Sequence, residues 1–130
     1  MATLQHPACS RMEGLPDEAL AQVAAYFQAL SEPTRLQILN LLRQQERSVG
    51  ELADLCGYSS ANISRHLSLL TQHGLVARES RGNSAIYSIA DKSVYALCDL
   101  VCGSIARQFK RTAQERAAFV NPATKRARAR

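Results

Sequence analysis

The sequence predicts a mainly α-helical fold that carries a small β-hairpin. Apolar residues recur at three- and four-residue steps over most of the chain, which is the period of amphipathic helices. From Leu75 the pattern changes to two short strand-like runs around a polar segment with a Gly-Asn pair, which is typical of a hairpin. Before this hairpin, Gly57 and Gly74 bound one of the helical segments.

Two helices are expected in the first third of the chain. Pro16 is followed by two acidic residues, and both features favour a helix start, which predicts a helix to about Leu30. A second helix should begin near Ser31, where a Ser-Glu-Pro-Thr run supplies a cap and an early proline. Its apolar face, within 36–42, is broad enough for a core helix, and 46–48 should form a polar break or a minimal strand.

The next two helices are short and lie close together in the sequence. The first is expected over 49–56, and Gly57 should stop it. The second should be capped by Ser59 or Ser60 and end at Gly74. Its apolar positions follow the spacing i, i+4, i+7, and they are Ile63, Leu67 and Leu70. The opposite face carries Ala61, Ser64, Arg65, Ser68 and Gln72.

The hairpin and a last helix complete the expected fold. The strand-like runs are 75–78 and 85–89, and the polar residues 79–84 between them are interpreted as the hairpin tip. Asp91 should cap the last helix. The apolar stripe of that helix is formed by Val94, Leu97, Cys98, Val101, Cys102, Ile105 and Phe109.

The length of 130 residues fits one domain. We expect a flexible arm over 1–15, the folded domain over 16–115, and a basic tail without fixed structure over 116–130. No apolar run is long enough to cross a bilayer and no secretory signal is visible, so a cytoplasmic location with reduced cysteines is expected. The net charge of +5 is compatible with a polyanionic partner.

Two short helices joined by a glycine turn, then a hairpin, are the parts of a winged helix-turn-helix. The helix after Gly57 would anchor through its leucines and present its polar face to the major groove of DNA. The alternative is a merely solvated polar face. The predicted DNA contacts are Ser59, Ser60, Asn62, Ser64, Arg65, His66 and Ser68 on this helix and its cap, and Arg78 and Arg81 on the hairpin.

Other classes of function are less compatible with the sequence. It has no glycine-rich phosphate loop, no Gly-x-Ser-x-Gly elbow and no His-Glu-x-x-His motif, so we do not expect an enzyme. A winged helix used only for protein contact is the other alternative. Arg65 and Arg81 on the polar surface favour DNA instead.

Several segments together resemble the ArsR/SmtB family of bacterial repressors. They are residues 29–39, 49–52, 60–67, 73–76 and 81–87. The resemblance covers about residues 16–110. It implies a homodimer paired through its first and last helices, binding to an inverted-repeat operator in double-stranded DNA, and release when an inducer such as a thiophilic metal or metalloid binds.

Two metal sites of that family are not matched in this sequence. Where the resemblance implies a Cys-Val-Cys motif, the chain has Ser48, Val49 and Gly50. For the zinc site of the last helix, Asp91 matches. The other three places are filled by Ser93, Ser104 and Arg107, so a zinc or cobalt sensor of that type is not expected.

Cys98 and Cys102 remain as candidate sensing residues. Their i, i+4 spacing places both sulfurs on one helix face, where they could bind one soft ion. Arsenite or antimonite would need a third sulfur, for which Cys9 on the arm of either subunit is a candidate. Alternatively, the pair senses oxidants or polysulfide, or both thiols only pack on the apolar stripe. Cys56 is interpreted as a packing residue.

Overall fold

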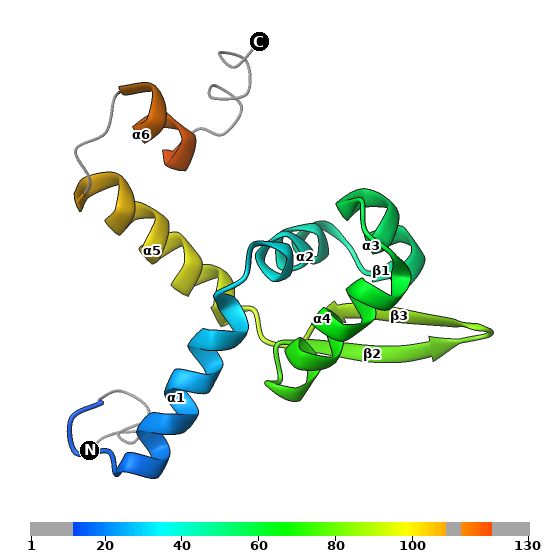
Figure 1. Cartoon of the computed structure of the whole chain (residues 1–130), viewed down its shortest axis with the longest axis horizontal. Helices are drawn as coiled ribbons and strands as arrows, with labels where there is room; N and C mark the ends of the chain where they lie inside the picture. Colours follow the sequence, from blue (N-terminus) through cyan, green and yellow to red (C-terminus); the bar gives the residue numbers. More distant parts are fainter. Residues whose placement is uncertain (1–11, 109–112, 121–130) are drawn as a thin grey trace. The chain divides into compact units, whose positions relative to one another are not determined.

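The computed structural model describes residues 12–108 and 113–120. The chain divides into two compact units, Met1–Ala90 and Asp91–Arg130, and each is described by itself. The first unit contains α1 to α4 and a small sheet, and the second contains α5 and α6 (Figure 1). Within the described residues, no helix combines the length and hydropathy that crossing a membrane requires.

Helix α1 (Asp17–Leu30) begins directly after Pro16, as the proline and acidic residues predict. It extends away from the other helices of its unit and meets them at its C-terminal end (Figure 1). Only Ala29 and Leu30 of this helix are buried. The other apolar residues of α1 are half-buried or exposed, with Leu20 and Phe27 as its exposed large side chains.

Helix α2 (Pro33–Gln44) starts two residues later than the sequence suggested. Glu32 caps it, since its carboxylate accepts a hydrogen bond from the Arg35 amide at 3.1 Å. The Ser31 hydroxyl instead donates to the Gln28 carbonyl at 2.9 Å and closes the end of α1. Ser31 and Glu32 thus serve two different helix ends, with Pro33 at the first position of α2.

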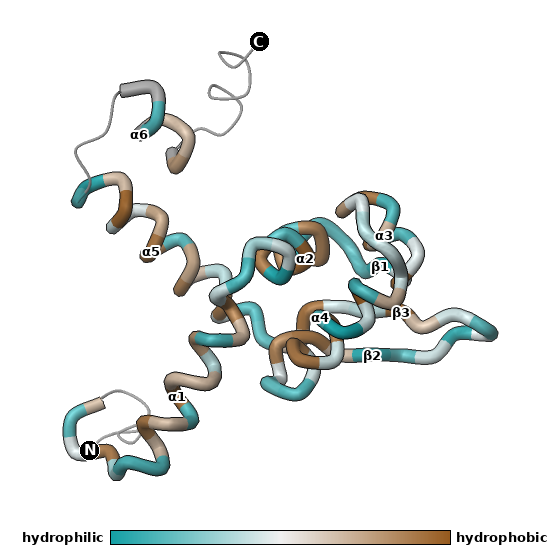
Figure 2. The backbone as a smooth tube through the Cα atoms, in the orientation of Figure 1, coloured by the Kyte–Doolittle hydropathy of each residue, from teal (hydrophilic) through white to brown (hydrophobic). Residues whose placement is uncertain are grey.

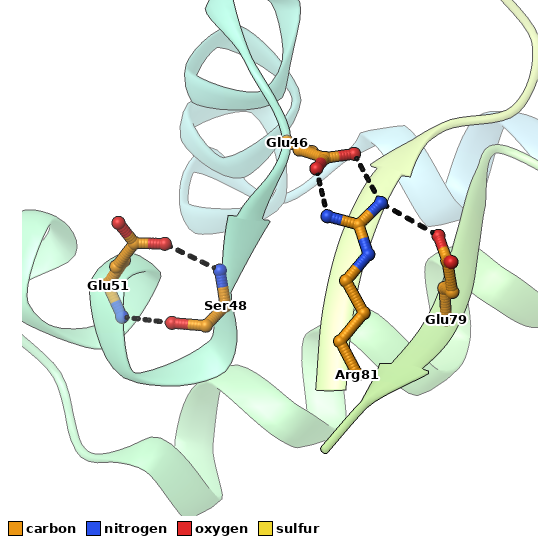
Figure 3. A network of polar contacts seen from close by, with 5 residues as sticks. All are labelled: Glu46, Ser48, Glu51, Glu79 and Arg81. Carbon is orange, nitrogen blue, oxygen red and sulfur yellow. Dashed lines mark hydrogen bonds and ion pairs between the residues drawn. The ribbon is translucent and has the colours of Figure 1, made fainter. Parts of the chain in front are cut away.

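Helices α3 (Val49–Cys56) and α4 (Ser60–Gln72) have the bounds that the sequence predicts. The Ser59 cap of α4 is also confirmed, whereas the C-cap of this helix is His73 and not Gly74. Ser48 and Glu51 form a capping box, in which each side chain accepts from the other residue's backbone amide (Figure 3). This arrangement satisfies two amides at the start of α3 that have no partner within the helix. Ser59 caps α4 by accepting from the Asn62 amide at 3.1 Å.

The core of the first unit lies where α2, α3, α4 and the sheet meet. One side of α4 supplies three of its fully buried side chains, at the predicted i, i+4, i+7 positions. Complete burial of a leucine or isoleucine stabilises a fold by about 1.5–3 kcal/mol. The six side chains without exposed surface in this core are Ile38, Leu52, Ile63, Leu67, Leu70 and Leu75.

The sheet has three antiparallel strands in the order β1-β3-β2, namely β1 (Arg47–Ser48), β2 (Val76–Arg81) and β3 (Ser84–Ile89). The minimal strand expected at 46–48 is thus β1, paired with β3. The hairpin is longer than expected, because its ladder continues to the pair Arg81 and Ser84. The tip is therefore only the two residues 82–83, not 79–84. Strand β2 is largely polar (Figure 2).

The second unit begins with Asp91, whose carboxylate accepts from the amide and hydroxyl of Ser93 at 3.0 and 2.7 Å. Helix α5 (Ser93–Gln108) follows, as predicted, and α6 (Ala113–Val120) comes after it. The first five residues of the segment 116–130, which we expected to lack fixed structure, lie in α6. Cys9 and Phe109 lie outside the described residues.

Candidate nucleic-acid interface

Helix α4 presents one polar face to solvent between two left-handed glycines. Gly57 and Gly74 have φ of 78° and 73°, values that other residues adopt only at a cost. They let the chain turn sharply before and after the helix. With the apolar side buried, the exposed side has the composition that a helix in the major groove needs. Its exposed residues are Ser60, Ala61, Ser64, Arg65, Ser68, Thr71 and Gln72.

Two of the predicted DNA contacts, Asn62 and His66, lie on the flank of α4 and are only partly exposed. The Asn62 side-chain oxygen is buried and has no hydrogen-bond partner among the described residues. His66 Nδ1 lies 3.2 Å from Arg35 Nη1. Because a guanidinium only donates, Nδ1 must accept, and the proton of the neutral ring is on Nε2. Both residues are thus less exposed than Arg65.

Arg35 connects three helices at this flank. Its Nε donates to the Ala29 carbonyl at 2.6 Å and its Nη2 to the Gln28 carbonyl at 3.2 Å, both at the end of α1. Its remaining terminal nitrogen contacts His66 on α4. A cation at the C-terminal end of α1 also interacts favourably with the helix dipole. Arg35 therefore ties the end of α1 to the flank of α4.

The two predicted arginine contacts of the hairpin lie on opposite faces of β2. Side chains alternate along a strand, and Arg78 accordingly donates to Ser80 at 3.5 Å, whereas Arg81 donates to Glu79 at 2.9 Å. Both arginines are exposed. They consequently cannot approach one DNA surface in the same way.

Arg81 belongs to an ion-pair cluster with Glu46 and Glu79, here called the wing cluster (Figure 3). Its Nη1 and Nη2 both bind the Glu46 carboxylate, Nη2 at 3.2 Å. The hydrogen bond from Arg81 lowers the pKa of Glu46. Glu46 and then Glu79 raise the pKa of Arg81. Glu46 and Arg81 therefore stay charged at neutral pH.

The cysteines in the described residues are all thiols. Cys98 and Cys102 are partly exposed on α5, at the spacing that places them on one side of that helix. Burial raises the pKa of Cys56, so this thiol is less readily ionised. Among residues 12–108 and 113–120, no group of three or more His, Cys, Asp or Glu could hold a metal ion. A metal bound by Cys98 and Cys102 would thus need a further ligand.

Sequence reasoning missed Arg35 and Glu46. Arg35 lies in the segment 29–39 that resembles the family, but nothing in that segment identifies its contacts, and Glu46 lies in no motif. Their partners His66 and Arg81 lie 31 and 35 residues away. Of these contacts, only the one between Glu79 and Arg81 could have been predicted from the sequence. Residues i and i+2 of a strand lie on the same face, so their spacing indicates that the two side chains are neighbours.

Comparison with known proteins gives a family match in this region. The pattern described as "Bacterial regulatory protein, arsR family" matches residues 32–78, from the cap of α2 into β2. The chain is 40% identical to an uncharacterized HTH-type transcriptional regulator of Mycobacterium tuberculosis, Rv0081, over 85 residues, which cover 65% of this chain and 75% of the relative. A probable mercury resistance operon repressor of Streptomyces lividans is 37% identical over 55% of this chain and 57% of its own.

Solved structures give the same result. The crystal structure of Rv0081 superposes with a TM-score of 0.65 and 36% identity, and covers 71% of this chain and 93% of that one. The solution structure of a homodimeric winged helix-turn-helix DNA-binding domain from Mycobacterium bovis, described as a possible ArsR-family transcriptional regulator, has a TM-score of 0.63 and 33% identity. It covers 77% of this chain and 98% of that domain.

Proposed function

This chain belongs to the ArsR family of DNA-binding transcriptional regulators, and from that premise we propose that it is a repressor that binds an inverted-repeat operator as a homodimer. We further propose that an inducer sensed by Cys98 and Cys102 releases it from DNA. The family is one of regulators, not of enzymes. The proposal therefore concerns which residues bind DNA and which sense the inducer.

The observation that carries the DNA-binding proposal is the division of α4 into two faces. Ile63, Leu67 and Leu70 have no exposed surface, so the helix is held firmly while Ser64, Arg65 and Ser68 face solvent. Arg65 can bind guanine or phosphate, and the serines can donate to either. Ser59 and Ser60 supply hydroxyls at the helix N-terminus, where backbone amides also favour phosphate.

The proposed homodimer accounts for apolar side chains that the single chain leaves exposed. On α1, Leu20 is 37% and Phe27 is 48% exposed, and on α5, Leu100 is 70% and Val101 is 46% exposed. Large apolar residues on two helices of a small protein are typical of a dimer interface. The Mycobacterium bovis domain, to which the chain is similar, is homodimeric. Two copies of α4 would then read two half-sites.

A binding titration tests the DNA-binding proposal. We would select a duplex from a random-sequence library with the wild-type protein and measure its affinity by fluorescence anisotropy, with a scrambled duplex for comparison. Arg65→Ala should weaken operator binding by about 1–3 kcal/mol if Arg65 reads a base. Arg43→Ala, which removes an exposed arginine of α2, is the matched control and should bind as wild type. Equal loss in both variants would contradict the assigned interface.

Cys98 and Cys102 are the proposed sensing residues, with Cys9 as a further ligand for a thiophilic ion such as arsenite or antimonite. Two thiols one helical turn apart suit a soft ion. A relative named as a mercury resistance operon repressor supports this class of inducer. The second candidate is sensing of oxidants or polysulfide by the same pair. It is supported because both thiols are partly exposed and because, among the described residues, Cys98 and Cys102 have no third cysteine on their helix.

A release titration separates these candidates. The reduced protein on its selected duplex would be titrated with arsenite, cadmium, mercury, zinc, peroxide and polysulfide. The variant Cys98→Ser/Cys102→Ser should resist every compound that releases the wild type. Cys9→Ser should lose the response to arsenite alone if Cys9 completes a three-sulfur site. If the double variant is released as readily as wild type, Cys98 and Cys102 are not the sensing residues, and the protein is a repressor without thiol sensing.

A further inference from the structure

The contacts of the Arg81 guanidinium affect how strongly the hairpin can attract DNA. Three hydrogen bonds join its terminal nitrogens to Glu46 and Glu79, and a guanidinium has five N–H donors in total. Its side chain is nevertheless 48% exposed, and those of Glu46 and Glu79 are 45% and 65% exposed. The cluster therefore lies in water, where ion pairs exchange partners at little cost.

The wing cluster also cancels the positive charge of the hairpin. On the face of the hairpin that carries Arg81, Glu46 and Glu79 contribute two negative charges beside its one positive charge. Arg78 lies on the opposite face, where it donates to Ser80. Non-specific binding to DNA depends on cations that neutralise phosphates. With its arginine on carboxylates, the tip of the hairpin offers a duplex almost no net attraction.

We propose that Glu46 is a positioning residue for operator recognition, which holds Arg81 away from non-specific DNA and releases it to a phosphate when α4 docks on the operator. This inference rests on the proposed DNA-binding function. On the operator, base contacts of α4 keep the hairpin close to the backbone. There the phosphates repel both carboxylates and attract the guanidinium, so Arg81 changes partners.

The salt dependence of binding measures this exchange directly. Each phosphate contact contributes about −0.9 to the slope of log K against log salt concentration. We would measure this slope on the selected operator and on a scrambled duplex, using full-length variants whose thermal melting matches wild type. The variants are Glu46→Gln/Glu79→Gln, Arg81→Gln and the triple combination.

The matched control is Glu51→Gln. Glu51 is a nearby carboxylate that forms the α3 capping box and makes no contact with Arg81 in the described network (Figure 3). Glutamine can occupy the same place in a capping box. The control thus removes one negative charge without opening the wing cluster.

We expect Glu46→Gln/Glu79→Gln to steepen the slope on scrambled DNA by about 0.9 and to leave the operator slope unchanged. Between about 50 and 200 mM salt, that variant should lose about threefold more affinity for scrambled DNA than wild type. Arg81→Gln should make the operator slope shallower by about 0.9 and leave the scrambled slope unchanged. The triple variant should show no gain on scrambled DNA.

Three results would overturn the inference. An operator slope unaffected by Arg81→Gln would mean that Arg81 never leaves its carboxylates. A gain that persists in the triple variant, or that Glu51→Gln reproduces, would mean a general charge effect. Wild type that binds both duplexes equally would instead overturn the proposed operator recognition, and this inference with it.

Discussion

Replacing Arg35 with methionine tests whether one side chain ties the end of α1 to the helix that would read DNA. Methionine keeps an unbranched apolar stem but removes every donor. The change thus deletes the hydrogen bonds to the Gln28 and Ala29 carbonyls and to His66 Nδ1, while the Arg35 amide can still donate to the Glu32 cap.

The expected loss in the free energy of unfolding follows from these three contacts. Hydrogen bonds contribute about 0.5–1.5 kcal/mol each to stability, and the contacts here are partly or fully exposed, which favours the lower half of that range. Arg35→Met should therefore lower the free energy of unfolding by about 1.5–3 kcal/mol. Of this, about 0.5–1 kcal/mol should be the contact with His66.

Urea denaturation at a fixed protomer concentration provides the assay, since association contributes to the stability of a dimer. A double-mutant cycle with His66→Ala isolates the contact between the two side chains. His66→Asn is the control, because its amide oxygen can accept where Nδ1 does. Effects of Arg35→Met and His66→Ala that add within about 0.3 kcal/mol would refute the proposed connection.

Three further changes probe the elements that hold the candidate interface. Ser59→Ala should cost about 1 kcal/mol, because the first turn of α4 loses its cap; a thermal melt unchanged from wild type would contradict this role. Leu67→Ala should cost about 2–5 kcal/mol, since it opens a cavity at a site without exposed surface, and the same urea assay measures it. Hydrogen bonds from the Ser93 hydroxyl and amide lower the pKa of Asp91. Its contribution to the start of α5 should be complete above the ordinary pKa of an aspartate and be lost as the pH falls through the lowered value. Helicity followed by circular dichroism should show this loss in wild type and not in Asp91→Asn.

The bounds of α3 and α4 and the Ser59 cap could be predicted because they depend on neighbouring residues. The periodic apolar positions of α4, the serine cap and the glycines on either side lie within one short segment, so the sequence is sufficient to place them. The same holds for α3, whose bounds match the prediction. The start of α2 was predicted near Ser31 and lies at Pro33. The sequence alone does not decide between the adjacent residues Ser31 and Glu32, because the side chain of either can accept a hydrogen bond from the first turn of a helix.

The family and its winged helix-turn-helix fold were likewise predictable, because several short motifs occur together in one order. The sequence did not define the length of the hairpin. A polar run such as 79–81 continues as strand only because β3 supplies partners for its backbone, and these pairings depend on register rather than on composition.

Only the tertiary structure decided which polar side chains remain available to DNA. Asn62 and His66 belong to the same helix as Arg65, yet the flank they occupy is half-buried, and the partner of His66 comes from α2. Arg81 is paired with Glu46 across 35 residues of sequence. No local pattern specifies such pairs, because two distant segments meet only after the core between them has packed.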